Sequence, residues 1–174
     1  MYDEIYRIPM IVKEPGSDAE RRFDQPVHLM DLTATLVDAI AGGPQEAMGG
    51  QRLHGRSLLP LAAGEDWYKP VHYAEYHGDW YGHYSARMAT DGRWKLVWNL
   101  WELCELYDLQ NDPAELRNLF YDDEHADVRA KYFGLLRKEA ERTGDAHLRL
   151  VSEEVEAAFG PSMAGPLQHQ RRID

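Results

Sequence analysis

The stretch Arg87–Asn99, RMATDGRWKLVWN, decides the fold of this chain. Its two arms alternate apolar and polar residues, and the Asp-Gly pair between them is a strong signal for a tight β-hairpin turn. Strand-like runs of the same kind lie on either side, VHYAEYHG at 71–78 and ELCELYDL at 102–109. The pattern predicts a small antiparallel sheet of three or four strands.

A helical pattern follows these strands, at 127–143, and Gly144 ends it. An antiparallel sheet must bury at least one face, so we expect this helix to cover it. The range 71–147 is therefore predicted to form an α+β subdomain in which the sheet packs on a helix. The apolar stripe of the helix consists of Val128, Tyr132, Leu135, Leu136 and Ala140.

The first part of the chain, 1–43, has a different pattern. Residues 8–12, IPMIV, form a continuous apolar run, which is typical of a strand buried on both faces. Residues 30–41 have helical spacing, with Asp31 as a candidate N-cap and Gly42 as a candidate stop. The range is interpreted as one strand and one helix of an α/β unit whose other half is absent. The helix is expected to pack on a sheet through Leu29, Leu32 or Thr33, Leu36, Val37 and Ile40.

Two segments carry no strong pattern. The range 44–70 is rich in glycine and proline and is predicted to be a connecting loop, in which Ser57 is a candidate cap for a short helical turn. The range 148–174 is predicted to be a tail arm, extended or disordered.

Composition excludes several classes of protein. The chain has 174 residues, and its 30 acidic and 19 basic residues give a net charge of −11, which argues against nucleic acid as a partner. No apolar run approaches the ~20 residues of a membrane span, and no signal peptide precedes the first predicted strand. We expect a soluble chain, cytoplasmic as given, without membrane partners. Cys104 is the single cysteine and is interpreted as a buried structural thiol.

One loop has the composition of a ligand-binding segment. The stretch HGDWYGH combines two glycines with aromatic, imidazole and carboxylate groups, and loops of this kind often contact ligands. Its candidate substrate-binding residues are His77, Asp79, Trp80, Tyr81 and His83. The histidine spacing fits neither a helix nor a strand, so no metal site is predicted here.

The residues alone indicate no complete catalytic site. Ser57 and Ser85 do not lie in a Gly-x-Ser-x-Gly turn, and no glycine-rich loop precedes a helix in the manner of a phosphate site. We therefore assign no catalytic residue and no metal ligand.

Several segments, taken in order, resemble those of the type I sulfatases, members of the alkaline phosphatase superfamily. The hairpin Arg87–Asn99 is similar to the family's R-x-x-R-T-x-x-W-K-L-I segment, and ELYDLQNDPAELRNLF is close to its E-L-Y-D-L-x-x-D-P-x-E-x-x-N-L block. Ala34 replaces a proline that is usual in the family. The other matching segments are IYRIPMIVKEPG at 5–16, VHLMDLTATLVDAIAG at 27–42 and HGRSLLPLAAGE at 54–65.

This resemblance implies a C-terminal portion of a sulfatase-like hydrolase. Residues 1–43 would then be the end of the large catalytic α/β domain, and 71–147 its C-terminal subdomain. Family members cleave sulfate esters with a formylglycine, from a C/S-x-P-x-R motif, and with calcium or another divalent ion. Neither that motif nor the metal-ligand motifs occur in this sequence. We expect the cofactor only in a full-length parent, the chain alone to be inactive, and Arg7 to be an anchoring residue.

The partner and the parent reaction remain open at this point. The first interpretation is that a missing N-terminal catalytic portion completes the chain. The second is a stand-alone binding or assembly module that forms a homodimer through the strand and helix of 1–43. A third keeps the superfamily but makes the parent a phosphate or phosphonate ester hydrolase.

Overall fold

The computed structural model of the protein describes residues 1–16, 20–43, 47–78, 85–99 and 103–145. The chain divides into two compact units. Unit 1 contains Met1–Met10 and Val71–Asp174, and unit 2 contains Ile11–Pro70.

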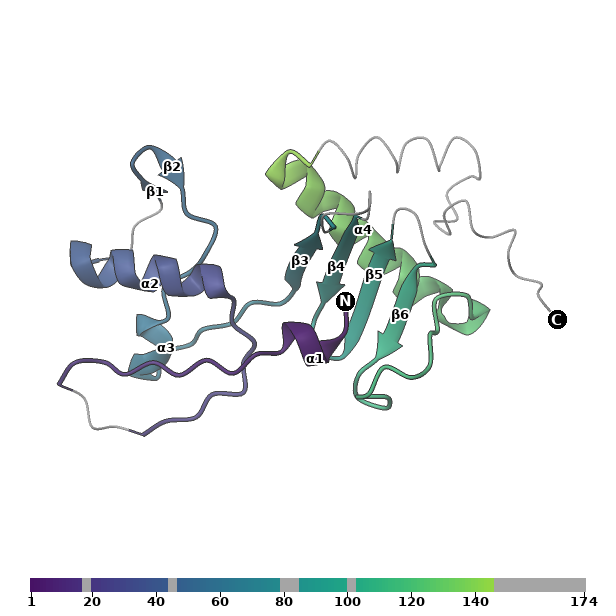
Figure 1. The fold of residues 1–174 in the computed structure, drawn as a ribbon, viewed down its shortest axis with the longest axis horizontal. Helices are drawn as coiled ribbons and strands as arrows, with labels where there is room; N and C mark the ends of the chain where they lie inside the picture. Colours follow the sequence, from purple (N-terminus) through teal and green to yellow (C-terminus); the bar gives the residue numbers. More distant parts are fainter. Residues whose placement is uncertain (17–19, 44–46, 79–84, 100–102, 146–174) are drawn as a thin grey trace. The chain divides into compact units, whose positions relative to one another are not determined.

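Unit 1 is built on a four-stranded antiparallel sheet with the order β3-β4-β5-β6 (Figure 1). Each strand therefore pairs with its neighbour in sequence, and Thr90 pairs with Lys95 beside the hairpin turn. The sheet predicted from the sequence is confirmed. Its strands are β3 (His72–Tyr76), β4 (Ala86–Thr90), β5 (Trp94–Asn99) and β6 (Glu105–Asp108).

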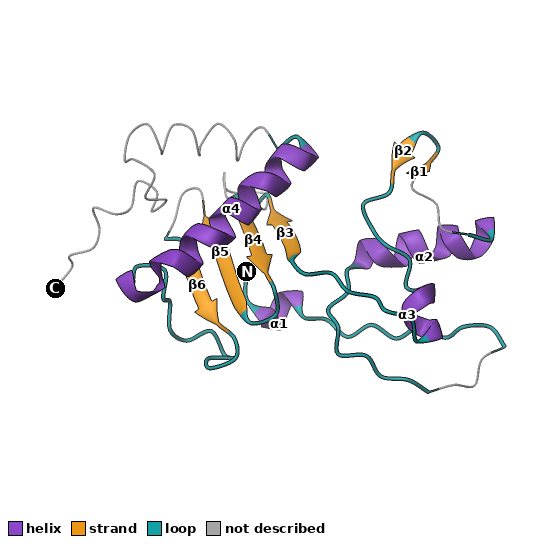
Figure 2. Cartoon of the chain, turned by 180° about the vertical axis from the view of Figure 1, so that it is seen from behind, coloured by secondary structure: helices purple, strands orange, loops and turns teal. Residues whose placement is uncertain are grey.

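Helix α4 (Ala126–Thr143) covers one face of this sheet, as Figure 2 shows. A short 3-10 turn, η1 (Asp123–His125), leads into the helix, and Gly144 ends it with a φ of 74°. The apolar stripe predicted for the helix forms the main core, to which Phe133 adds a ring 4.6 Å from that of Trp98. The core comprises Ala89, Leu96, Trp98, Cys104, Leu106, Leu119, Phe120, Tyr132, Phe133, Leu136 and Ala140.

The opposite face of the sheet is covered by the first residues of the chain. The short helix α1 (Asp3–Tyr6) lies on this side, away from α4 (Figure 1). Met1 packs against a small cluster formed by Ala86, Met88 and Val97. Strand alternation explains the two layers, because successive side chains of β4 and β5 point to opposite faces.

The predicted strand at 8–12 is wrong for this structure, and those residues form neither strand nor helix. The side chains of Ile8, Ile11 and Val12 are exposed, at 54%, 94% and 55%. A strand requires a hydrogen-bonded neighbour, and none of the strands in the described ranges pairs with this segment. The boundary also differs from the prediction, because residues 1–10 belong to the unit that contains the small sheet.

Unit 2 contains the second predicted helix, α2 (Leu29–Ala41), which ends at Gly42 as expected. Its N-cap is His28, one turn earlier than the predicted Asp31. Asp31 instead closes a capping box, because its Oδ2 accepts a hydrogen bond of 2.8 Å from the backbone N of His28. Unit 2 also holds α3 (Leu59–Ala63) and a two-stranded sheet of β1 (Ala47–Met48) and β2 (Gln51–Arg52).

Helix α2 turns its polar side inward, which contradicts the expectation that its apolar stripe is buried. Leu29, Leu36 and Ile40 are 64%, 56% and 87% exposed. The residues of α2 that are buried are instead Asp31, Ala34, Thr35 and Asp38. The cause is a loop that bonds to these polar side chains. Three side chains of the apolar stripe, Leu29, Leu36 and Ile40, therefore remain exposed within the described part of the chain, while Leu32 and Val37 are half-buried.

Candidate functional site

The predicted substrate loop follows β3, and only its first residues can be placed. His77 is exposed, and its Nε2 lies 3.1 Å from the carboxylate of Glu75. Asp79, Trp80, Tyr81 and His83 lie outside the described residues, so the structure does not test whether the five candidates converge. Because each strand is antiparallel to its neighbour, β3 and β5 end at the same edge of the sheet.

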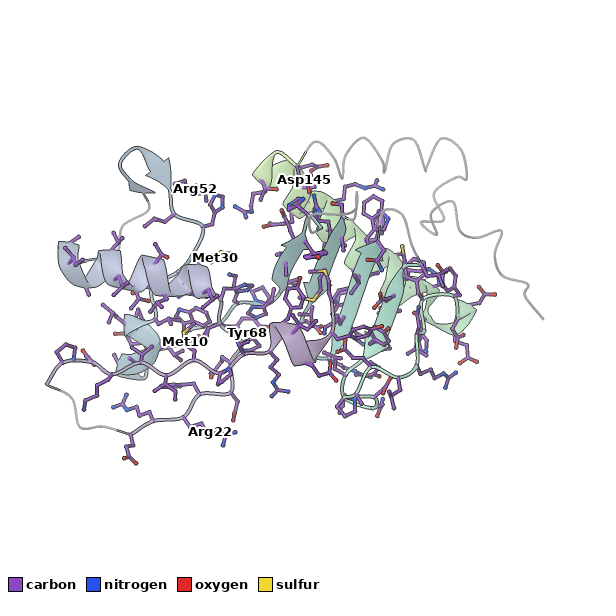
Figure 3. All side chains as sticks on the ribbon, viewed as in Figure 1. Met10, Arg22, Met30, Arg52, Tyr68 and Asp145 are labelled. Carbon is purple, nitrogen blue, oxygen red and sulfur yellow. The ribbon has the colours of Figure 1, made fainter. Side chains whose placement is uncertain are left out.

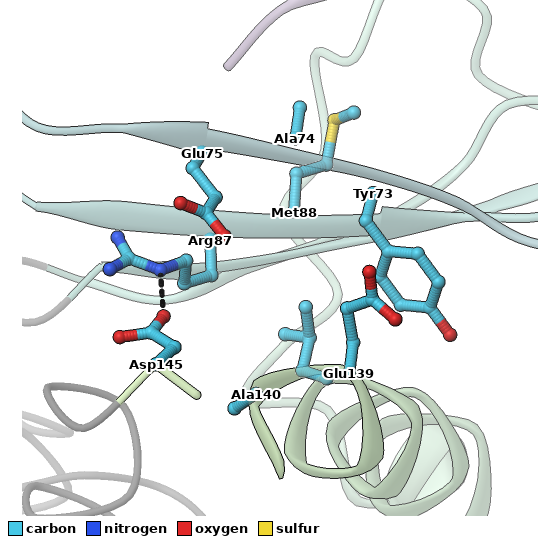
Figure 4. Close-up of a pocket in the computed structure, with 9 residues that line it drawn as sticks. Tyr73, Ala74, Glu75, Arg87, Met88, Glu139, Ala140 and Asp145 are labelled. Carbon is cyan, nitrogen blue, oxygen red and sulfur yellow. Dashed lines mark hydrogen bonds and ion pairs between the residues drawn. The ribbon is translucent and has the colours of Figure 1, made fainter. Parts of the chain in front are cut away.

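A small pocket lies near that end, between the sheet and the last turns of α4 (Figure 4). Its main feature is the buried guanidinium of Arg87, which donates to Asp145 Oδ2 at 2.6 Å and to Ser85 Oγ at 2.8 Å. Glu75, Glu139 and Asp145 also line the pocket. Figure 3 places Asp145 just after α4, so this ion pair ties the end of the helix to the sheet.

The pocket is too small for a sugar substrate on its own. Its cavity volume is about 10 Å³, far below the ~300–1,000 Å³ that is usual for small-molecule sites. Because Arg87 is fully engaged with Asp145, Ser85 and a backbone carbonyl, its role here is structural. A substrate site at this end of the sheet would need additional residues to enclose the substrate.

On the opposite face of the sheet, Lys95 is the centre of a buried charge cluster. Its side chain is 1% exposed and donates to Glu115 Oε1 at 2.7 Å, to Asp3 Oδ1 and to the carbonyl of Met1 at 3.2 Å. Lys95 and Glu115 come from the two sequence blocks most similar to the sulfatases. Their association explains why a lysine and a glutamate 20 residues apart occur in a core of this kind.

The block 105–120 is organised by polar side chains that bond to the backbone. Asn118 accepts from the backbone N of Leu106 at 3.1 Å and donates to the carbonyl of Cys104 at 2.9 Å. Asp108 accepts from the backbone N of Gln110 and from the side chain of Asn111. These residues hold the turn after β6 in place, and they are structural.

In unit 2, the loop 54–58 is fixed to the polar side of α2. Asp31 Oδ1 accepts from the backbone N of Arg56 at 2.8 Å, and Thr35 Oγ1 accepts from the backbone N of Leu58 at 2.8 Å. Gly55 passes so close that an added Cβ would lie 2.0 Å from the carbonyl oxygen of Met30. Ser57 Oγ accepts from the backbone N of Leu59, the first residue of α3, at 3.3 Å, but the N-cap of this helix is Leu58 and not the predicted Ser57.

Ionisable groups elsewhere behave as buried structural groups. Burial raises the pKa of the Cys104 thiol to about 12, so this thiol is unreactive. Burial, together with the nearby positive charge of Lys69, lowers the pKa of His28 despite the opposing effect of Asp31. Within the described ranges, no group of three or more His, Cys, Asp and Glu side chains is arranged to hold a metal ion. None of the helices in those ranges is long and apolar enough for a membrane span.

Sequence reasoning did not predict the charge cluster of Lys95, Asp3 and Glu115. Lys95, Asp3 and Glu115 are far apart in the sequence, and each carries an ordinary surface charge when read alone. The available signal was a lysine at an inward position of a strand, between two apolar neighbours. Such a residue requires a buried counter-charge.

Comparisons with known proteins agree with the fold and with the sequence blocks. Residues 1–142 match the family described as N-sulphoglucosamine sulphohydrolase, C-terminal. The sulfatase YidJ of Escherichia coli is 35% identical over 134 residues, covering 75% of this chain. The delta 4,5-hexuronate-2-O-sulfatase of Bacteroides thetaiotaomicron is 31% identical over 160 residues, covering 86% of this chain. The solved structure of a 2-O GAG sulfatase is 30% identical over 67% of this chain, with a TM-score of 0.58.

In each case the chain spans a minority of the relative. It covers 25% of the Escherichia coli sulfatase, 31% of the hexuronate sulfatase and 25% of the 2-O GAG sulfatase structure. The match to the family spans both units and includes the sheet, α4 and the charge cluster. The chain therefore belongs to the N-sulphoglucosamine sulphohydrolase C-terminal family and corresponds to the C-terminal portion of sulfatase-like proteins of the alkaline phosphatase superfamily.

Proposed function

We propose that this chain is the C-terminal part of a sulfuric ester hydrolase, and that it acts by docking onto a catalytic portion that supplies the reactive groups. The observation that carries the proposal is the exposed apolar stripe of α2, formed by Leu29, Leu36 and Ile40. The chain alone would then be inactive, because no formylglycine motif occurs in its sequence.

Physical reasoning supports a covered surface at this stripe. Burying a leucine or isoleucine side chain stabilises a protein by roughly 1.5–3 kcal/mol, so three such side chains left in water represent a substantial driving force for association. Ile11 and Val12 belong to the same unit and are also exposed, so they add to its exposed apolar surface. We propose the catalytic portion as the occupant, because this chain covers only 25% of the Escherichia coli protein, which leaves most of that relative outside the match. Its formylglycine and its calcium or other divalent ion would lie in that portion.

The proposed substrates are sulfated sugars of the glycosaminoglycan class. Support comes from relatives named as a hexuronate-2-O-sulfatase and a 2-O GAG sulfatase, and from the family description. Aromatic rings and carboxylates suit the stacking and hydroxyl hydrogen bonding that a sugar requires. We propose that His77, Asp79, Trp80, Tyr81 and His83 form one wall of the substrate cleft.

The test begins with the coding sequence upstream of Met1. An in-frame C/S-x-P-x-R motif is expected, and the longer protein should hydrolyse 4-methylumbelliferyl sulfate and an unsaturated 2-O-sulfated disaccharide. The chain expressed alone should hydrolyse neither. Faster hydrolysis of a phosphate or phosphonate ester by the longer protein would overturn the sulfatase assignment.

Association is tested separately by co-expressing this chain with the upstream portion under different tags. Co-purification of the two pieces is expected, and Leu36→Ser combined with Ile40→Ser should abolish it. A stable homodimer of the chain alone by light scattering, unaffected by the upstream portion, would contradict the docking proposal and favour an assembly module.

A further inference from the structure

The first residues of the chain are attached to the sheet mainly through charge. We call Met1–Tyr6 the strap, since it crosses the sheet face opposite α4 (Figures 1 and 2). We propose that Lys95 is a positioning residue that latches this strap to the sheet, and that the latch opens without unfolding the core between the sheet and α4.

The ammonium of Lys95 is shared between the sheet and the strap. Lys95 projects from β5 and is 1% exposed. Two of its acceptors, Asp3 Oδ1 and the carbonyl of Met1, belong to the strap, and the third is Glu115 Oε1. An ammonium buried this deeply needs acceptors for its three donors, because an unsatisfied buried charge is costly. The strap therefore supplies groups that Lys95 requires.

Glu115 closes the latch from the other side. Its Oε2 accepts a hydrogen bond of 2.6 Å from the backbone N of Asp3, while its Oε1 binds Lys95. Its side chain is 1% exposed, and its backbone φ is 54°. A non-glycine residue in this left-handed region is sterically disfavoured, which indicates that the turn after β6 is held in position so that Glu115 faces the strap.

The other contacts of the strap are fewer, and they include a side-chain hydrogen bond between Tyr2 and Tyr107. Helix α1 spans 4 residues, far fewer than the ~12–15 that an isolated helix needs in water. Ile5 is 72% exposed, and the rings of Tyr2 and Tyr107 are 6.2 Å apart in a tilted arrangement. Met1 is the only strap residue in the small apolar cluster of that face. Attachment therefore depends mainly on the Lys95 cluster, to which the Tyr2–Tyr107 hydrogen bond and the packing of Met1 add.

The latch has a structural consequence for unit 2. The polypeptide leaves unit 1 after Met10 and returns to it at Val71, so unit 2 is tethered at both ends. Opening the latch would free the first of these two connections from the sheet. Because the main core lies on the α4 side and does not include Lys95, the strap can detach while that core remains folded.

The test measures hydrogen exchange by mass spectrometry on the full chain, comparing wild type with Lys95→Met. The amides of Asp3, Ile5, Tyr6 and Arg7 are hydrogen-bonded in the closed strap. We expect the strap peptide to exchange at least about tenfold faster in the variant, with α4 and β4–β6 unchanged. Lys138→Met, which removes an exposed lysine of α4, is the matched control and should leave every peptide unchanged.

A second variant keeps the test decisive if Lys95→Met does not fold. Asp3→Asn changes the latch from the strap side, where the side chain is 29% exposed. It should also loosen only the strap, and Lys95→Arg should restore part of the protection because it retains the charge. Unchanged strap exchange in Lys95→Met and Asp3→Asn, or an equal loss of protection in the strap and in β5, would overturn the proposal.

Discussion

At the scale of single residues, polar side chains of the sulfatase-like blocks stabilise the fold. Asp108 lies at the end of β6 and receives hydrogen bonds from Gln110, Asn111 and the guanidinium of Arg93. Burial alone would raise the pKa of Asp108, but Arg93 and Asn111 hold that pKa below its ordinary value. The ionised carboxylate is therefore the form that the folded chain favours.

This shift makes a testable contribution to stability. A carboxyl whose pKa is lower in the folded state stabilises the fold above its unfolded pKa of about 3.9, and this stabilisation is lost as the pH falls through the folded pKa. We expect Asp108→Asn to lower the free energy of unfolding by about 1–2 kcal/mol at pH 7. The deficit should shrink below about pH 4.

Urea unfolding of both proteins at pH 7 and pH 3 measures this difference. Glu141→Gln, at an exposed position of α4, serves as the control and should change the free energy of unfolding by less than ~0.5 kcal/mol. A deficit for Asp108→Asn that is equally large at both pH values would contradict the assigned charge effect.

Gly55 provides a second residue-scale prediction, because backbone contact leaves no room for a side chain. Its Cβ would lie 2.0 Å from Met30 O and 2.8 Å from Asp31 N. Gly55→Ala should destabilise unit 2 by more than about 2 kcal/mol, measured as faster hydrogen exchange in α2.

Gly134 is the matched position for this substitution, since it lies in α4 and an added Cβ would meet nothing within 4 Å. Gly134→Ala should stabilise the chain by roughly 0.5–1 kcal/mol, because alanine favours the helix. Equal effects of the two substitutions would show that the Gly55 contact is looser than described.

At the scale of elements, hydrophobic periodicity correctly predicted those helices and strands whose formation depends on nearby sequence. The hairpin 87–99 and helix α4 formed as expected because their apolar residues meet partners within the chain. The run 8–12 was misread because a strand depends on a neighbour, which its own sequence cannot supply. Helix α2 was correctly placed, but its orientation could not be predicted. The loop that bonds to Asp31 and Thr35 selects the buried side.

The inverted orientation of α2 reverses the usual effect of substitutions. Leu36→Ser replaces a side chain that is 56% exposed and should change the stability of the chain alone by less than ~0.5 kcal/mol. Thr35→Val, one residue earlier, removes the acceptor for the backbone N of Leu58 and should cost about 1–3 kcal/mol.

Thermal unfolding of the two variants, followed by circular dichroism, measures this contrast. The introduced residues, serine and valine, have similar helix propensities, so most of the difference between the variants should come from burial and hydrogen bonding. A larger loss for Leu36→Ser than for Thr35→Val would mean that the apolar stripe is covered within the chain.

At the scale of the whole molecule, the chain combines a self-contained unit with one that presents an uncovered surface. The sequence blocks identified the family from residues near one another in sequence. The contact between Asp3 and Lys95 joins residues 92 positions apart, and the assignment of 1–10 to unit 1 depends on such contacts. The candidate substrate loop was predicted from composition, and four of its five residues lie outside the described ranges. Its role remains a prediction.

The buried position of Cys104 makes its thiol a natural probe of how often the core opens. It is the single thiol of the chain, it is 3% exposed, and it lies in the core between the sheet and α4. A thiol reagent can therefore modify the chain once at most, and only after that core opens. The rate of modification would count core openings directly, without an introduced probe.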